Sequence, residues 1–125
     1  MNDIYFQKIQ GIMSSLEGVE LKENTKKKFR FKFYLTDKML NTPIEELDLS
    51  VRSYHSLKRA GYETIGALAT AVAGGESLGN IRNCGKKSVR EIMVQLFLYN
   101  YYSMSAGKQE KYLLETVLLN KNSTE

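Results

Sequence analysis

The residues of this sequence that could do chemistry gather in one stretch, LGNIRNCGKKSVREI, at positions 78–92. This stretch brings Gly85, Lys86, Lys87 and Ser88 to the expected start of a helix. A helix start presents unpaired N–H donors and the positive end of the helix dipole, so it attracts anions. The glycine lets the backbone approach an anion closely, the lysines add charge, and the serine adds a hydroxyl donor. The stretch therefore predicts a phosphate-binding site.

The spacing argues against a nucleotide-binding P-loop, which needs four residues between its first glycine and a Gly-Lys-Ser/Thr run. Here five residues separate Gly79 from Gly85, and Lys87 stands between Lys86 and Ser88. No clear apolar strand leads into the loop. A hairpin followed by a helix fits the extended backbone of a nucleic acid better than it fits a triphosphate.

The same stretch has the spacing of a helix-hairpin-helix motif, in which apolar residues hold the hairpin and a glycine turn faces DNA. The matching residues are Leu78, Ile81, Gly85, Ser88 and Ile92. The alternative is a helix start that is stabilised by its own cap and binds nothing. The lysine doublet favours the DNA interpretation.

A second cluster lies in SVRSYHS, at residues 50–56, on another predicted helix. Arg52, His55 and Ser56 stand at i, i+3 and i+4, so they share one helix face. An arginine, an imidazole and a small hydroxyl suit phosphates and the narrow, electronegative minor groove of A-tract DNA. A lone surface histidine is often incidental, and its switchable charge permits a role without requiring one.

Residues that start and stop helices are dense in the middle of the sequence. Thr42 begins a capping box with proline at the first helical position, and Ser50 and Thr64 can cap the next two helices. Gly61 ends one of these helices, and a longer helix is predicted from Gly85. The middle is therefore predicted to consist of short helices joined by tight turns.

Both ends of the sequence add helix. Apolar residues recur at helical spacing over residues 3–16, and residues 108–119 have an amphipathic pattern. In the basic segment 26–34, phenylalanine alternates with lysine or arginine over residues 28–33, which predicts a half-buried ribbon that protects a sheet edge or touches nucleic acid. The predicted fold class is mostly α, a compact bundle of short helices with helix-hairpin-helix-like units. An N-terminal helix plus a short basic β ribbon precede this bundle, and a C-terminal helix follows it.

Three segments follow from this pattern: an N-terminal extension at 1–41, a central helical domain at 42–104, and a C-terminal helix with a frayed tail at 105–125. A length of 125 residues suits one domain with extensions. The net charge is +4, and most of the basic excess lies in the first segment, where eight basic residues accompany five acidic ones. This balance permits nucleic-acid binding without requiring it.

The composition argues against several classes of protein. No apolar run is long enough to cross a membrane and no signal peptide is recognised, so a cytoplasmic location is expected. The single cysteine, Cys84, allows no internal disulfide, and together with the single histidine it offers no zinc site. No cofactor or metal is expected. Since no nucleophile–base pair or functional carboxylate cluster suggests a reaction, we predict that the protein is not an enzyme.

Two motifs occur in order along the sequence: L-x-L-S-V-R-S from Leu47, and N-x-G-K-K-S-x-x-E-I from Asn83. Together they resemble the carboxy-terminal domain of the bacterial RNA polymerase alpha subunit, over about residues 43–98. The resemblance implies a compact bundle of short helices that binds double-stranded DNA in the minor groove and favours AT-rich tracts. It also implies contacts with RNA polymerase, sigma factor or a transcription regulator.

Carried onto this sequence, the resemblance makes Arg52 the main side chain for the minor groove. It implies that Gly85, Lys87 and Ser88 hold the DNA backbone, and that Glu91 orients the basic residues around it.

The sequence departs from the family's pattern at two positions. His55 stands where asparagine is usual, which removes the amide's paired donor and acceptor but leaves phosphate contact open. Cys84 stands where an apolar residue is usual, and we interpret it as a small buried hydrophobe. Residues 1–41 do not resemble the polymerase-assembly domain of the alpha subunit, so a freestanding small protein is expected.

The leading hypothesis is a non-catalytic DNA-binding protein that acts in transcription. A few cations give only a modest affinity for DNA. A second copy in a homodimer, or a protein partner, is therefore expected to raise the fraction of DNA sites that are occupied. The helices at 3–16 and 108–119 are candidates for that pairing, with packing on their own bundle as the alternative. Two other functions stay open: an adaptor for polymerase, sigma or a regulator, and a helix-hairpin-helix module of DNA repair or recombination.

Overall fold

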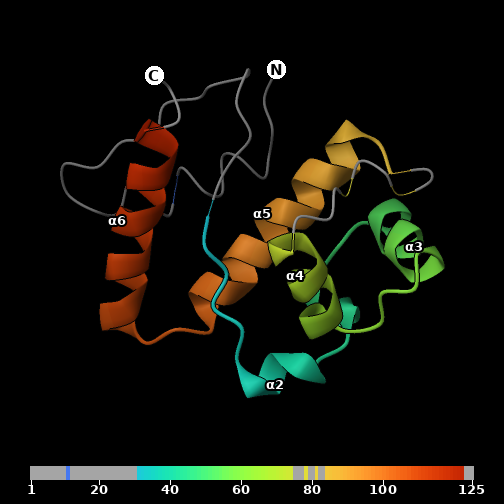
Figure 1. Cartoon of the computed structure of the whole chain (residues 1–125), viewed down its shortest axis with the longest axis horizontal. Helices are drawn as coiled ribbons and strands as arrows, with labels where there is room; N and C mark the ends of the chain where they lie inside the picture. The colour runs from blue at the N-terminus through green and yellow to red at the C-terminus, as the bar shows by residue number, and fades with distance from the viewer. Residues whose placement is uncertain (1–10, 12–30, 75–77, 79–80, 82–83, 123–125) are drawn as a thin grey trace. The chain divides into compact units, whose positions relative to one another are not determined.

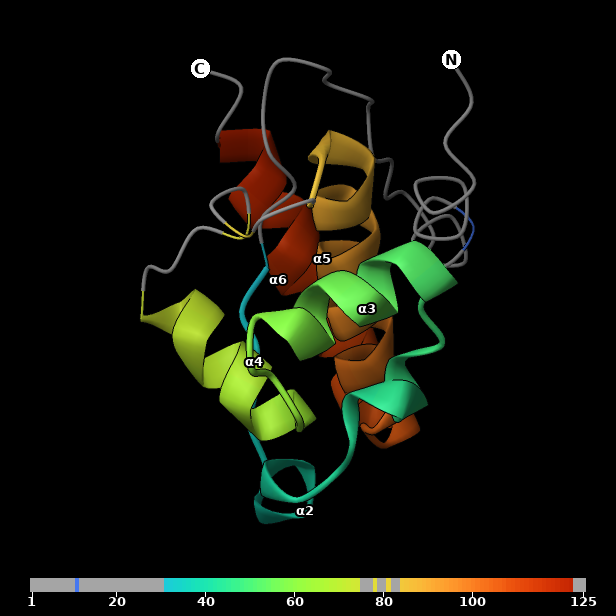
Figure 2. The ribbon, with the colours of Figure 1, turned by 90° about the vertical axis from the view of Figure 1, so that its right-hand side faces the viewer.

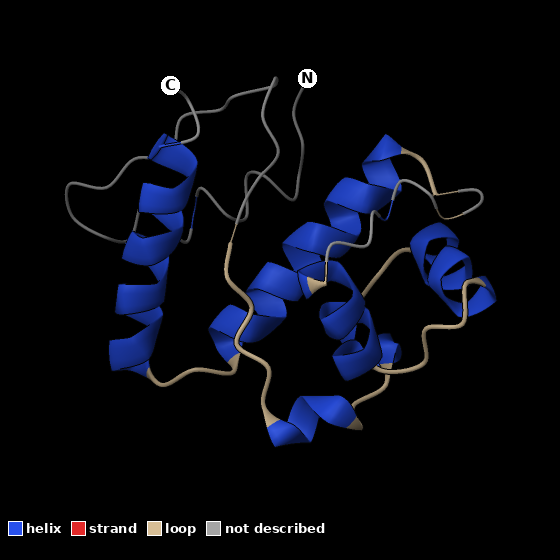
Figure 3. Ribbon diagram, viewed as in Figure 1, coloured by secondary structure: helices blue, strands red, loops and turns tan. Residues whose placement is uncertain are grey.

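The protein divides into two compact units in the computed structural model (Figure 1). The structure describes residues 11, 31–74, 78, 81 and 84–122, with side chains as far as 119. One unit is Phe33–Tyr99, and the other joins Met1–Lys32 to Asn100–Glu125. Apart from one isolated bridge, between Pro43 and Thr64, all regular structure among the described residues is helical (Figure 3). The mostly α fold is therefore confirmed.

Short helices follow one another through the unit Phe33–Tyr99. They are α2 (Asp37–Leu40), the 3-10 helix η1 (Ile44–Leu47), α3 (Val51–Arg59), α4 (Ile65–Ala73) and the first part of α5 (Lys86–Tyr102). The turn before α5 is held by two hydrogen bonds of 3.1 Å, from the Ile81 N–H to the Leu78 carbonyl and from the Cys84 N–H to the Ile81 carbonyl.

Hydroxyl caps start α3 and α4 where the sequence predicts them. The Ser50 hydroxyl accepts a hydrogen bond from the Ser53 N–H at 3.3 Å, and the Thr64 hydroxyl accepts one from the Ala67 N–H at 3.1 Å. Each cap satisfies a donor that the geometry of a helix start leaves unpaired. After α3, Gly61 takes a φ of 96°, a left-handed conformation that glycine adopts without strain.

The capping box predicted at Thr42 is wrong. The Thr42 hydroxyl donates to the Lys38 carbonyl at 2.7 Å, so it closes the end of α2 and does not cap the next helix. That next element, η1, has four residues, and its N-cap position, Pro43, makes no capping hydrogen bond. It ends where Asp48 takes a φ of 55°. No sequence pattern predicts α2, because four residues are too few to show a helical period.

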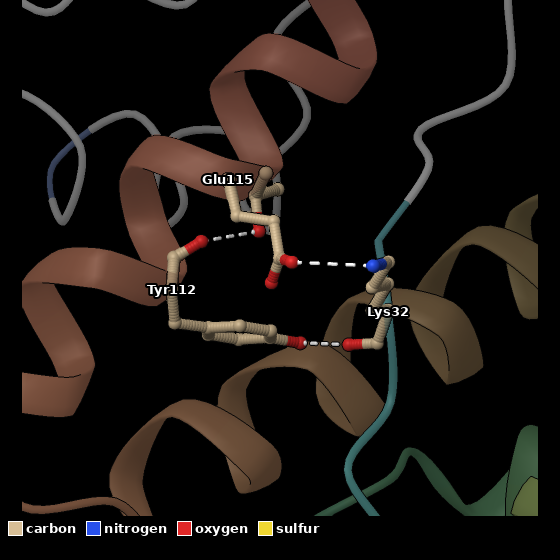
Figure 4. Close-up of polar contacts among 4 residues, drawn as sticks. Lys32, Tyr112 and Glu115 are labelled. Atoms are coloured by element: carbon tan, nitrogen blue, oxygen red, sulfur yellow. Dashed lines mark hydrogen bonds and ion pairs between the residues drawn. The ribbon is translucent and has the colours of Figure 1, made fainter.

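The basic β ribbon predicted at 26–34 does not form in its described part. Residues 31–36 belong to no helix or strand, so the prediction is wrong there, and residues 26–30 lie outside the described residues. The Lys32 carbonyl accepts a hydrogen bond of 2.6 Å from the Tyr112 hydroxyl (Figure 4). A side chain of α6 (Ala106–Asn122) thus makes the hydrogen bond that a neighbouring strand would otherwise make to this carbonyl.

The core of the unit Phe33–Tyr99 draws on all of its helices. Side chains exposed by 1% or less include Met39, Ile44, Leu57, Ile65, Leu68, Ile92, Leu96 and Phe97. Burying each such apolar group contributes on the order of 1.5–3 kcal/mol. The isolated bridge adds hydrogen bonds from the Ile65 N–H to the Thr42 carbonyl at 2.8 Å and from the Ile44 N–H to the Glu63 carbonyl at 3.1 Å.

The other unit contains α6 (Ala106–Asn122), which includes the helix predicted at 108–119. In the turn before α6, the Ser103 hydroxyl donates to the Asn100 carbonyl at 2.7 Å. The Gln109 amide donates to the Tyr101 carbonyl at 3.0 Å, which ties the first turn of α6 to the end of α5. Of the helix predicted at 3–16, only Gly11 lies within the described residues, and it is helical.

Helices α2 and α4 approach each other closely at Gly66. A Cβ atom at this position would lie 2.7 Å from the Leu40 Cα atom, which belongs to the backbone of α2. Backbone atoms, unlike the end of a flexible side group, do not rotate aside. The approach of the two helices therefore requires glycine.

We expect Gly66→Ala to lower the free energy of unfolding by about 1–3 kcal/mol, because its methyl group forces α2 and α4 apart. Gly107→Ala in α6 is the matched control, since a Cβ there meets nothing within 4 Å. The control should keep or slightly raise stability. Urea unfolding followed by far-UV circular dichroism measures both, and equal stability of the two variants would contradict the close approach.

Candidate nucleic-acid interface

One buried carboxylate bonds the start of α3 to α5. Glu91 is 4% exposed, and its two oxygens accept three hydrogen bonds from α3 and its cap. Ser50 donates through its N–H at 2.6 Å and through its hydroxyl at 2.7 Å, and the Ser53 hydroxyl donates the third bond. Because a buried carboxylate without partners is strongly destabilising, these bonds fix the two helices together at this point.

A second contact holds the same junction one turn further along α5. The Gln95 amide donates to the Asp48 carbonyl, just ahead of α3, at 3.1 Å. Gln95 follows Glu91 by four residues, so both side chains project from one face of α5. Figure 2 shows the result, with α3 crossing in front of α5.

This junction carries an exposed basic surface. Arg52 lies in the first turn of α3, Lys86 and Lys87 lie in the first turn of α5, and all three are exposed. None of these three side chains makes a hydrogen bond or an ion pair with another described residue. The sequence placed them in two separate motifs, and the bonds to Glu91 bring the two motifs together.

These cations stand where they destabilise their own helices. The first turns of α3 and α5 contain no acidic residue, whereas the first turn of η1 contains Glu45 and Glu46. A cation at a helix start opposes the helix dipole by about 0.3–1 kcal/mol. The charge of the cation also adds to the positive potential at the helix start. Each of these two helix starts therefore attracts anions more strongly than the dipole alone would.

Three of the predicted site residues are buried: Ser56 is 1% exposed, Ser88 is 7% exposed and Glu91 is 4% exposed. The Ser56 hydroxyl donates to the Arg52 carbonyl at 3.0 Å, within α3. These three side chains therefore lie inside the fold and not on the exposed surface. The predicted site residues that are exposed are Arg52, His55, Gly85, Lys86 and Lys87.

Gly85 is exposed, and the fold does not require glycine there. A Cβ atom at this position would meet nothing within 4 Å, and the residue has no positive φ. The space beside the backbone at the start of α5 is therefore open. This is the space that a close approach by an anion needs.

The two departures from the family's pattern lie in different environments. His55 is exposed on α3, and its ring meets that of Tyr54 edge-on with the centroids 5.4 Å apart. Cys84 is 7% exposed, and burial raises the pKa of its thiol. Cys84 is thus the small buried hydrophobe that the sequence predicts.

Sequence reasoning missed the partners of Glu91 and one exposed cation. Ser50 is predicted as a helix cap, but nothing in the spacing indicates that it bonds to a residue 41 positions away. Ser53 carries no sequence signal of this role. Arg90 lies on α5, and its helical spacing from Lys87 could have placed it beside the predicted surface.

Comparison with known proteins identifies the family. A family model for the C-terminal domain of the bacterial RNA polymerase alpha subunit matches residues 34–97. This protein belongs to that family. The resemblance carried by the two motifs is confirmed, and the matched domain is non-catalytic, as predicted.

Several alpha subunits of bacterial RNA polymerases are similar to this protein. The DNA-directed RNA polymerase subunit alpha of Rubrobacter xylanophilus is 52% identical over 67 residues, which are 54% of this chain and 20% of that protein. The same subunit of Desulforudis audaxviator is 43% identical over 89 residues, 69% of this chain and 25% of that protein. The matched region thus spans between 20% and 25% of the length of these relatives. No solved structure matches.

Two further properties concern the described residues alone. None of the helices they form combines the length and the apolar character that crossing a membrane requires. Among the same residues, no three histidine, cysteine, aspartate or glutamate side chains are grouped so that they could hold a metal ion.

We expect Glu91→Gln to lower the free energy of unfolding by about 1–3 kcal/mol, because an amide replaces one acceptor oxygen with a donor that faces serine hydroxyls. Glu46→Gln, at an exposed position in the same unit, is the matched control and should stay within about 0.5 kcal/mol of the unsubstituted protein. Urea unfolding of the unsubstituted protein and the two variants measures the three free energies. A Glu91→Gln protein as stable as the control would mean that this carboxylate does not hold α3 to α5.

Cys84 should react slowly with a thiol reagent in the folded protein, because its thiol is buried and its raised pKa keeps it protonated at neutral pH. Unfolding in urea should raise the rate at least tenfold. Ser105→Cys in a Cys84→Ser background provides the exposed control thiol, which should react fast in both conditions. Equal rates for Cys84 in the folded and unfolded protein would show that it is accessible.

Proposed function

We propose that this protein is a non-catalytic DNA-binding protein linked to transcription. Its central domain at 42–104 would contact the DNA backbone and the AT-rich minor groove. One observation carries the proposal: the bonds to the buried Glu91 join two helix starts, and these starts expose Arg52, Lys86 and Lys87. Membership of the polymerase alpha C-terminal family supports it.

The backbone contact follows from the chemistry of helix starts. Phosphate oxygens accept hydrogen bonds from free N–H groups, and the dipole favours negative charge at this end of a helix. The open space at Gly85 lets a phosphate reach the start of α5, where Lys86 and Lys87 neutralise its charge. Such contacts release counterions from DNA, so affinity falls steeply as the salt concentration rises.

Arg52 is the residue that we assign to the minor groove. It is exposed in the first turn of α3, and a narrow A-tract groove has the enhanced negative potential that attracts an inserted arginine. His55 lies one turn further along α3, so it reaches the same strand of DNA and contacts a phosphate. An AT-rich preference follows from this arrangement, since groove width depends on the sequence.

The relatives suggest the partners. They are named as subunits of DNA-directed RNA polymerase, and we propose that this protein associates with RNA polymerase, sigma factor or a transcription regulator in the bacterial cytoplasm. Two DNA-binding surfaces held together bind more tightly than one, which is the advantage that a homodimer or a partner would bring.

A role as a protein adaptor is the second candidate, and an acidic edge favours it. Glu45, Glu46 and Asp48 lie just before α3. The Tyr54 hydroxyl donates to the Glu45 carboxylate at 2.7 Å and lowers the pKa of that carboxyl, so Glu45 stays ionised. This edge repels DNA and suits a basic protein surface.

Fluorescence anisotropy with an A-tract duplex and a GC-rich duplex, each at two salt concentrations, tests the DNA proposal. We expect tighter binding to the A-tract, and a loss of about tenfold or more in Arg52→Ala, because one inserted arginine contributes about 1–3 kcal/mol. Lys87→Ala should weaken binding to both duplexes alike and reduce the salt slope by about one. Lys38→Ala, at an exposed lysine of α2, is the control and should bind like the unsubstituted protein.

If neither duplex binds at low salt, or if Arg52→Ala and Lys87→Ala bind like the Lys38→Ala control, the DNA proposal is wrong. The adaptor function would then lead, and Glu46→Lys would be the variant to compare in binding to polymerase.

A further inference from the structure

Helix α3 has two exposed sides that differ in charge. On one side, the half-buried Tyr54 and Lys58 bond to carboxylates. The Tyr54 hydroxyl donates to the Glu45 carboxylate at 2.7 Å, and the Lys58 ammonium forms an ion pair with Glu63. The cation on this side is thus neutralised, and Glu45 adds a negative charge. An anionic ligand is not attracted to this side of the helix.

The other exposed side of α3 is basic from its first turn to its last. At about 100° per residue, Arg59 lies within roughly 20° of Arg52 around the helix axis, and His55 lies about 60° from Arg52. All three residues are exposed, and none of them makes a hydrogen bond or an ion pair with another described residue. Helix α3 itself contains no aspartate or glutamate. Arg52, His55 and Arg59 therefore form one row of uncompensated basic side chains, the α3 stripe.

Arg59 is the member of the α3 stripe to which the proposed function gives no role. It lies in the last turn of α3, where a cation favours the helix dipole. Lys58 lies in the same turn and has the same effect on the dipole. The two residues differ in direction, since Lys58 turns to a carboxylate whereas Arg59 continues the row of Arg52 and His55. The helix dipole explains a cation at this end, and it does not explain that alignment.

The α3 stripe has a length that suits a DNA strand. An α-helix rises roughly 10 Å over seven residues, which is the distance between Arg52 and Arg59 along the axis of α3. The phosphates of one DNA strand follow one another at about 3.4 Å along the duplex axis, so the stripe covers about three of them. The planar guanidinium of an arginine matches a phosphate with two parallel hydrogen bonds. A strand that passes Arg52 can therefore meet His55 and then Arg59.

We propose that one DNA strand runs along α3 and that Arg59 binds a phosphate of this strand, outside the groove that Arg52 enters. The contact adds affinity for every sequence and leaves the AT-rich preference to Arg52, because phosphates carry no direct sequence information. It also orients the duplex, with Glu45 and Glu63 on the side of α3 away from the strand. This inference rests on the proposed function, to which it adds a binding residue and a direction.

Fluorescence anisotropy of Arg59→Gln tests the contact, with Lys58→Gln as the matched control. Each substitution removes one positive charge from the last turn of α3, so the net charge and the helix dipole change alike. We expect Arg59→Gln to weaken binding to the A-tract and GC-rich duplexes by the same factor, about three- to tenfold, and to reduce the salt slope by about one. Lys58→Gln should stay within about twofold of the unsubstituted protein, with an unchanged salt slope. Far-UV circular dichroism verifies that both variants are folded.

Duplexes that carry one uncharged methylphosphonate linkage locate the phosphate. At the phosphate that Arg59 binds, this linkage should weaken binding by the unsubstituted protein and by Lys58→Gln. It should have no further effect on Arg59→Gln, because that variant has already lost the interaction. If the effects of the linkage and of Arg59→Gln add at every position, Arg59 binds no phosphate.

Equal weakening by Arg59→Gln and Lys58→Gln would also overturn the inference, since net charge alone would then explain the effect. Arg52→Ala distinguishes this failure from failure of the proposed function. If Arg52→Ala still weakens binding, DNA binding stands without the Arg59 contact, and if it does not, both are wrong. An Arg59→Gln protein that binds DNA normally but loses affinity for RNA polymerase would assign Arg59 to an acidic protein surface instead.

Discussion

A buried carboxylate has to find its hydrogen bonds inside the protein, and this requirement at Glu91 governs the candidate site. The carboxylate is 4% exposed and takes all three of its bonds to α3 from Ser50 and Ser53. Without those donors the buried carboxylate would lose three hydrogen bonds, which would lower the free energy of unfolding by about 1–3 kcal/mol. These three bonds hold the start of α3 against α5, and the bond from the Gln95 amide to the Asp48 carbonyl adds a second contact at the same junction.

The residues that stabilise this junction are buried, whereas the cations that we propose for binding are exposed. Beneath the surface, short serine side chains fill the space between closely packed helices: Ser53, Ser56 and Ser88 are all buried. Arg52 and Lys87, in contrast, are exposed, and their side chains make no hydrogen bond or ion pair with another described residue. They even oppose the dipoles of their own helices. Their placement against the dipoles of their own helices does not favour stability, and it fits the anionic ligand that we propose.

Local signals in the sequence predicted α3 and α4, and they failed at Thr42, where a nearby group competes, and around Lys32, where a distant group does. The caps at Ser50 and Thr64 and the glycine after α3 act within one turn, so their residue types reveal them. Thr42 has the same residue type as Thr64, yet its hydroxyl bonds to the Lys38 carbonyl behind it, since α2 ends there. The strand predicted around Lys32 does not form for a similar reason. The Lys32 carbonyl, which would accept a hydrogen bond from a neighbouring strand, accepts one from the hydroxyl of Tyr112, 80 residues away.

The site shows the same division. Its exposed members were predictable, because lysines at a helix start and an arginine in a first turn are visible in the sequence. The bond that unites them was not, since it joins positions 41 apart, and only the resemblance to a family pointed to Glu91. This difference has a consequence for how such a domain can vary. His55 is exposed, its ring meets that of Tyr54, and it takes no part in the hydrogen bonds to Glu91. A histidine in place of asparagine at this position therefore changes the exposed surface and leaves the buried hydrogen bonds between α3 and α5 intact. Substitutions among the buried serines act on the fold first, and would act on the proposed binding only through it.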